Sequence, residues 1–169
     1  MKLVLAAILS FMQFSAFAEV CLSTIDETAP EEQFNVATGG TVIDSTTKLM
    51  WMRCAIGQTW HVQDNYCYGD PTPMTWQQAL QIAHGYEFSD RSGWRLPNLK
   101  ELSTIVERQC VRSSINSTMF PNTPSDDFWT STPSMVDLER SWVIAFFNGS
   151  NSLKQKTLFT YVRLVRNAD

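Results

Sequence analysis

The ten residues GWRLPNLKEL, from Gly93 to Leu102, mark a change from extended chain to helix. Pro97 biases the residue before it away from helical backbone angles, so the first part of the stretch is extended. Asn98 is then the expected N-cap of a helix, and Glu101 completes a variant of the capping box. Arg95 stands at the junction, where a guanidinium can bind several carbonyls or a carboxylate at once. We interpret four residues of this stretch as structural rather than as ligand contacts: Arg95, Pro97, Asn98 and Glu101.

Two helices are expected. Thr75 and Gln78 form a capping box for the first, and Gly85 is suited to end it. The second begins after Asn98 and is expected to end near residues 108–110. Its buried stripe has helical spacing and contains Leu99, Leu102, Ile105 and Val106.

The remaining periodic segments have the pattern of strands. Residues 41–44 and 48–53 flank a short turn, and the second half of the chain is rich in alternating or continuous apolar runs. These runs are 128–132, 141–147, 153–159 and 161–166. Because the helices and strands are segregated along the chain, we expect an α+β fold with two helices packed on a mainly antiparallel sheet.

The first 18 residues are interpreted as a Sec signal peptide. Lys2 gives a positive start, an apolar stretch follows, and Ala16-Phe17-Ala18 supplies small residues for cleavage. A membrane anchor is the alternative, but the apolar stretch is short for a bilayer. We expect a lead-in over residues 19–39, one domain over 40–169 and no transmembrane segment in the mature chain.

The four cysteines all lie in the exported part, which favours two disulfides formed in an oxidising compartment. Three pairings are possible, and we favour Cys54–Cys67 and Cys21–Cys110. The first would close a loop rich in glycine and polar residues. The second would tie the mature N-terminus to the end of the second helix. A zinc site is disfavoured because no pair has C-x-x-C spacing.

The charge balance argues against nucleic acid as a partner. The chain has 13 Lys and Arg, including Lys2 of the leader, against 17 Asp and Glu, so the exported part is acidic. Nucleic-acid binding needs a basic footprint. One basic run, which could form a local patch or a solvated strand face, contains Lys154, Lys156, Arg163 and Arg166.

Two groups of residues are candidates for binding. Trp60, His61, Tyr66 and Tyr68 lie in the loop that the short disulfide would close, and aromatic rings on such a loop suit stacking on a sugar or a partner. Burial of Trp60 against the loop is the alternative. Oxygen ligands that could hold calcium, the only cofactor considered, are Asn116, Asp126 and Asp127, which could instead cap a turn.

No motif indicates catalysis. The chain has no G-x-S-x-G and no HExxH, and neither His61 nor His84 has a supporting motif. The cysteines have a better use as disulfides than as nucleophiles. We therefore expect a protein that is not an enzyme.

Five elements in order resemble the Lcl C-terminal domain family over about residues 40 to 166. They are Leu49-Met50-Trp51, Trp76-Gln77-Gln78-Ala79-Leu80, Gly93-Trp94-Arg95-Leu96-Pro97-Asn98 with Glu101-Leu102, Phe128-Trp129-Thr130-Ser131-Thr132, and Val162-Arg163-Leu164-Val165-Arg166. The resemblance implies a C-type-lectin-like fold, distantly related to the formylglycine-generating enzyme.

The same resemblance implies exported or surface-exposed bacterial proteins. Its namesake is an adhesin domain that binds sulfated glycans and forms a trimer, whereas this chain is acidic and contains no collagen-like stalk. We expect a periplasmic, secreted or cell-surface domain that binds a glycan or an envelope protein. A structural or assembly accessory protein of the envelope or of a pilus system is the alternative.

Overall fold

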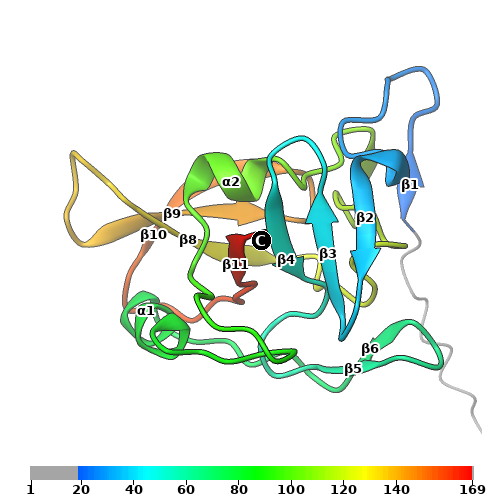
Figure 1. Cartoon of the computed structure of the whole chain (residues 1–169). Coiled ribbons are helices and arrows are strands. Elements are labelled where there is room, and N and C mark those ends of the chain that lie inside the picture. Colours follow the sequence, from blue (N-terminus) through cyan, green and yellow to red (C-terminus); the bar gives the residue numbers. More distant parts are fainter. Residues whose placement is uncertain (1–18, 169) are drawn as a thin grey trace, which may run out of the picture.

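The computed structural model describes residues 19–168, in which two α-helices pack against mainly antiparallel sheets (Figure 1). The expected α+β class is therefore confirmed. The expected signal peptide, residues 1–18, lies outside the described residues. A 3-10 turn, η1 (Glu31–Gln33), precedes the first larger sheet.

The first sheet contains four strands in the order β11-β4-β3-β2. They are β2 (Phe34–Ala37), β3 (Thr41–Asp44), β4 (Leu49–Met52) and β11 (Val165–Asn167). All neighbours are antiparallel, and Val42 lies opposite Trp51. The segment expected as a lead-in thus contributes β2 to this sheet.

The second sheet contains β8 (Asp127–Pro133), β9 (Arg140–Ala145) and β10 (Ser150–Gln155), in the order β10-β9-β8. Residues 153–159 were expected to form one strand, but β10 ends at Gln155. Residues 161–166 were also expected to form a strand, but the strand β11 begins only at Val165. The part before β11 reaches the second sheet, because Tyr161 forms a bridge with Phe128.

Both helices begin as the sequence predicts. Helix α1 (Trp76–Ala83) has the capping box of Thr75 and Gln78, and α2 (Leu99–Ser103) has that of Asn98 and Glu101. In each box the side chain of the cap residue accepts a hydrogen bond from the backbone N–H of the residue three positions later. The side chain of that later residue in turn accepts from the backbone N–H of the cap. Two N–H groups that a helix leaves without partners are thus satisfied.

The expected end of α2 near residues 108–110 is wrong, because the helix stops at Ser103. The β-branched residues that follow are poor helix formers, and the chain turns into non-local contacts. The amide of Glu107 donates to the carbonyl of Ser114 at 3.0 Å. The expected apolar stripe is nevertheless buried, and Leu102, Ile105 and Val106 belong to the main core.

Two short ribbons complete the fold. Strands β1 (Val20–Cys21) and β7 (Cys110–Val111) pair at the N-terminal end, and β5 (Thr59–His61) pairs with β6 (Tyr66–Tyr68). Each ribbon carries one disulfide, Cys21–Cys110 or Cys54–Cys67. The favoured pairing of the four cysteines is therefore confirmed.

The core divides into two clusters, one packed under α2 and the other under α1. Trp51 and Trp129 are fully buried, one in each cluster. The Nε1 of Trp129 donates to the carbonyl of Met74 at 2.8 Å, whereas the buried Nε1 of Trp51 has no hydrogen-bond partner within the described residues. This interior holds the β5–β6 ribbon and the loop between β8 and β9 at opposite ends of the molecule (Figure 1).

Candidate ligand-binding site on the β5–β6 hairpin

The β5–β6 hairpin is held at its base by covalent and polar contacts. The disulfide joins Cys67 of β6 to Cys54, which follows β4. The side chain of Asn122 donates to the carbonyl of Cys67 at 2.8 Å, and Gln58 donates to the carbonyl of Asn122 at 2.9 Å. These contacts fix a short ribbon that would be marginal on its own.

The hairpin has an inner and an outer face, because successive side chains in a strand point to opposite sides. Trp60 lies opposite Cys67 and belongs to the inner face. The guanidinium of Arg53 lies 4.2 Å from the centre of its ring. On the same side, a Cβ at Gly40 would come within 2.5 Å of Trp60.

Trp60 therefore anchors the hairpin to the body of the protein. Of the four aromatic residues predicted to bind ligand, it is the one that the structure separates from the rest.

The outer face carries His61, Tyr66 and Tyr68. The ring of Tyr68 lies 5.2 Å from that of His61 and 5.0 Å from that of Tyr66, both edge-on. Tyr66 is 38% exposed and Tyr68 is 48% exposed. We name these three residues, together with Asp64, the aromatic face.

Asp64 provides the polar part of the aromatic face. Its carboxylate accepts a hydrogen bond from the Tyr68 hydroxyl at 3.2 Å and lies 3.3 Å from Nδ1 of His61. The hydrogen bond to Asp64 raises the pKa of Tyr68 above its ordinary value. Sequence analysis did not single out Asp64, although it lies between the two strands that carry the rings. An exposed aromatic ring can stack its face on the C–H face of a sugar, and a carboxylate beside it can accept hydrogen bonds from the sugar's hydroxyls.

The residues predicted to bind calcium are engaged within the fold. Oδ1 of Asn116 accepts from the amides of Thr118 and Met119 at 3.1 and 3.0 Å. Oδ1 of Asp126 accepts from the next amide at 2.7 Å, and Asp127 forms an ion pair with Lys154. Asn116 and Asp126 thus make the turn contacts of the alternative interpretation, whereas Asp127 lies in β8 and is paired with a lysine. Calcium binding by these residues stays a prediction.

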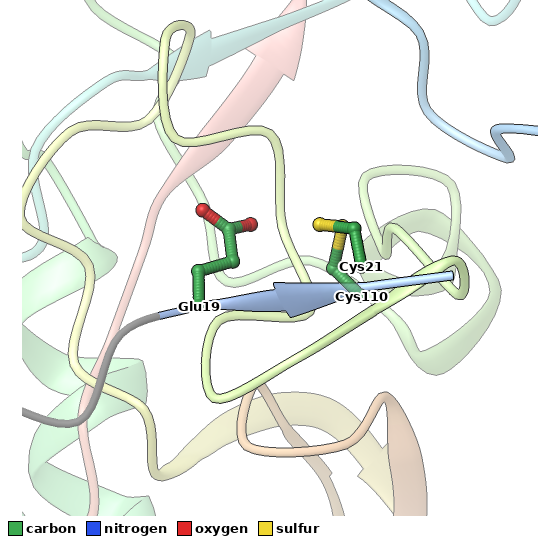
Figure 2. A group of neighbouring side chains, drawn as sticks. All are labelled: Glu19, Cys21 and Cys110. Atoms are coloured by element: carbon green, nitrogen blue, oxygen red, sulfur yellow. A yellow bond between two sulfur atoms is a disulfide. The ribbon is translucent and has the colours of Figure 1, made fainter. Parts of the chain in front are cut away.

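A second cluster of possible ligand atoms lies at the N-terminal ribbon. Figure 2 shows the carboxylate of Glu19 beside Cys21 and Cys110, whose sulfur atoms are joined. Because a cysteine binds a metal as a free thiolate, the disulfide leaves the Glu19 carboxylate as the single possible ligand of this group.

The junction residues predicted to be structural make several contacts within the fold. The guanidinium of Arg95 makes two hydrogen bonds of 2.7 Å, one to each oxygen of Glu101. The amide and carbonyl of Arg95 also pair with Val165 of β11. Pro97 is buried, and its carbonyl accepts from the amide of Ser131 at 2.7 Å.

The basic run near the C-terminus does not form one solvated face. Arg163 is buried, and its guanidinium donates to the carbonyls of Met52 and Arg53 and to Thr123 Oγ1. Desolvation, with the nearby charge of Arg53, lowers the pKa of Arg163 to about 9. The reading as a solvated strand face is therefore wrong for Arg163, whose role is to bind backbone carbonyls.

Sequence analysis also missed an exposed apolar loop and a cavity. The loop between β8 and β9 exposes Met135, Val136 and Leu138 almost fully. A cavity of about 720 Å³ lies beside α1 and is lined in part by Trp76 and Leu80. The sequence signal for the loop is the presence of Met135, Val136 and Leu138 between the two runs expected as strands, 128–132 and 141–147.

The model of the Lcl C-terminal domain family matches residues 40–166, so the chain belongs to this family. Membership indicates a surface-associated domain. The two disulfides indicate an oxidising, exported environment. A comparison with curated proteins finds no match. Across residues 19–168, no helix combines the length and the apolar character that crossing a bilayer requires.

Proposed function

We propose that this protein is an exported, non-catalytic binding domain of the bacterial surface, which recognises a glycan through the aromatic face. The observation that carries the proposal is the grouping of His61 and Tyr66 around the Tyr68 ring, with the Asp64 carboxylate beside it, on a disulfide-held hairpin. A rigid platform of exposed rings binds with little loss of conformational entropy. The C-type-lectin-like fold implied by the family resemblance accords with this role.

The charge around the aromatic face favours neutral or amino sugars over sulfated ones. Between Arg53 and Arg91 the chain has no lysine or arginine, while Asp64 and Asp70 lie in or beside the hairpin. A sulfated ligand would need basic partners to offset its charge. Neutral sugars need only stacking and hydrogen bonds, both of which the rings and Asp64 offer.

The test is a glycan array that includes neutral, amino and sulfated oligosaccharides, probed with and without calcium. We expect binding to neutral or amino sugars that does not change when calcium is removed. Tyr68→Ala should weaken it at least tenfold, which removes the array signal, whereas Phe147→Ala, which removes an exposed ring outside the hairpin, should not. A blank array, or hits that persist in Tyr68→Ala, would contradict the proposal.

A structural or assembly role in the envelope is the second candidate. It is favoured by the apolar loop between β8 and β9, since contiguous exposed apolar residues mark protein contacts. If this candidate is correct, a pull-down from envelope extracts should return one stoichiometric protein while the array stays blank.

A further inference from the structure

The loop between β8 and β9 is built to hold apolar side chains in solvent. Met135 is 89% exposed, Val136 is 90% exposed and Leu138 is 75% exposed. We name these three residues the apolar tip. The tip projects from the left edge of the molecule in Figure 1, at the end opposite the β5–β6 hairpin. Single exposed apolar residues are ordinary, but here three of four consecutive residues are apolar and exposed, which indicates a binding surface.

The tip is rigid, so its exposure is not that of a loose loop. Oγ of the buried Ser134 accepts from the amides of Val136 and Asp137 at 3.3 and 3.0 Å. Asp137 in turn pairs with Arg140 at 3.0 Å. Lys156 donates to the carbonyl of Leu138 at 2.6 Å. A pre-ordered apolar projection loses little entropy when it enters a groove.

A groove that suits the tip lies beside it on the same chain. The cavity of about 720 Å³ is walled on one side by α1, through Trp76 and Leu80, and on the other by Glu139 and Lys156. Trp76 is fixed, because its Nε1 donates to the carbonyl of Thr130 at 2.8 Å and Lys156 lies 4.4 Å from its ring centre. We name this cavity the α1 groove.

The apolar tip does not fill the α1 groove of its own chain, although Glu139, which follows Leu138 of the tip, lines that groove. The hydrogen bonds of Ser134 and Lys156 hold the tip outward. Two copies that face each other can therefore exchange tips, each entering the α1 groove of the other. One twofold axis satisfies both contacts, which is the geometry of an isologous dimer.

The charges at the rim of the groove fit this arrangement. Glu139 and Lys156 carry opposite charges and both line the groove. A twofold axis can bring Glu139 of one copy towards Lys156 of the other, and the reverse. Asp137 is already paired with Arg140, so it brings no uncompensated charge. A bilayer fits less well, because the carboxylate of Glu139 beside the tip would be costly to insert.

We propose that this protein self-associates as a weak twofold dimer in which the apolar tip of each copy fills the α1 groove of the other. Because each copy contributes three apolar side chains, we expect an interface of the small class, which buries less than about 1,200 Å² in total. The association is therefore concentration-dependent. It leaves both β5–β6 hairpins free at the far ends of the dimer, where two weak sites can act together.

Sedimentation velocity of the oxidised protein over a wide concentration range tests the dimer. We expect the wild type to move from monomer towards dimer as concentration rises. Val136→Asp in the tip and Leu80→Glu in the groove should each remain monomeric. The matched control, Val36→Asp, changes an exposed valine on β2 and should dimerise as the wild type does. Melting curves verify that each variant is folded.

Mixing the two monomeric variants separates tip-in-groove contact from other modes. The Leu80→Glu copy keeps an intact tip and the Val136→Asp copy keeps an intact groove, so one of the two contacts can form. We expect partial recovery of dimer in the mixture and none in either variant alone. A wild type that stays monomeric, a dimer that survives Val136→Asp, particles larger than a dimer, or no recovery on mixing would overturn the proposal. None of these outcomes depends on whether the aromatic face binds a glycan.

Discussion

The guanidinium of Arg95 and the carboxylate of Glu101 form a two-pronged ion pair, with both nitrogen–oxygen distances at 2.7 Å. Glu101 also accepts the amide of Asn98 at 2.8 Å, so the pair links the strand-like segment to the first turn of α2. The two hydrogen bonds raise the pKa of Arg95 although partial burial opposes this. The pair thus orients the capping carboxylate at the point where the chain changes from extended to helical.

Replacement of Arg95 by alanine should destabilise the protein modestly. The side chain of Arg95 is 42% exposed, so solvent screens part of the attraction, and we expect a loss of about 1 kcal/mol. Arg95→Lys keeps the charge but cannot make both hydrogen bonds to the carboxylate, so its stability should lie between those of the wild type and of Arg95→Ala. Urea unfolding measures the free energies. A variant that unfolds as the wild type does but no longer binds glycan would show instead that Arg95 contacts ligand.

The pH dependence of stability should carry the signature of Glu101. Burial alone would raise the pKa of Glu101, but the hydrogen bonds from Arg95 and Asn98 outweigh it and hold the pKa below its ordinary value. The unfolded state therefore binds the proton first as pH falls. The contribution is complete above the ordinary glutamate pKa of about 4.3 and is lost as pH falls through the lower folded value.

Unfolding free energies of the wild type and of Glu101→Gln, measured from neutral to acidic pH, test this. We expect the wild type to be the more stable at neutral pH and the difference to shrink below about pH 4.3. A difference that is constant across the range would mean that the Glu101 charge contributes nothing.

Features set by neighbours in sequence were predictable, and features set by distant contacts were not. Both capping boxes were predicted, because each joins residues three apart. The early end of α2 was missed because Glu107 binds the amides of Thr28 and Ala29 at 3.1 and 2.9 Å, far away in the chain. The β-branched residues after Ser103 are a local signal against a longer helix, but no pattern near residue 107 indicates its bonds to Thr28 and Ala29.

The same limit explains what was missed at the candidate site. The aromatic residues of the hairpin were predicted from composition, but strand alternation places Trp60 on the face opposite Tyr66 and Tyr68. The guanidinium that lies over the Trp60 ring belongs to Arg53, which lies before the disulfide loop in the sequence and not within it. Arg163 was misjudged because its charge suggests exposure, whereas the carbonyls that bind it lie 110 and 111 residues away.

The two disulfides should differ in what they support. On the chain-entropy model, Cys54→Ala with Cys67→Ala should cost about 3 kcal/mol, and Cys21→Ala with Cys110→Ala, which opens the longer loop, about 4 to 5 kcal/mol. Only the first pair holds the aromatic face, so only its removal should also weaken glycan binding. Denaturant titration and binding isotherms measure the two effects. Equal loss of binding in both double variants would remove the link between this disulfide and the site.

Tyr68 and Trp60 should separate binding from folding on the same hairpin. Tyr68 is exposed and contacts ligand in our proposal, so Tyr68→Ala should weaken glycan binding at least tenfold, about 1.4 kcal/mol, with little change in melting temperature. Trp60 packs under Arg53 and against Gly40, so Trp60→Ala should lower the melting temperature and weaken binding only as the hairpin loosens. Trp60→Phe keeps an inner-face ring and should restore most of both properties. If Trp60→Ala instead abolishes binding at unchanged stability, the binding surface lies on the inner face of the hairpin.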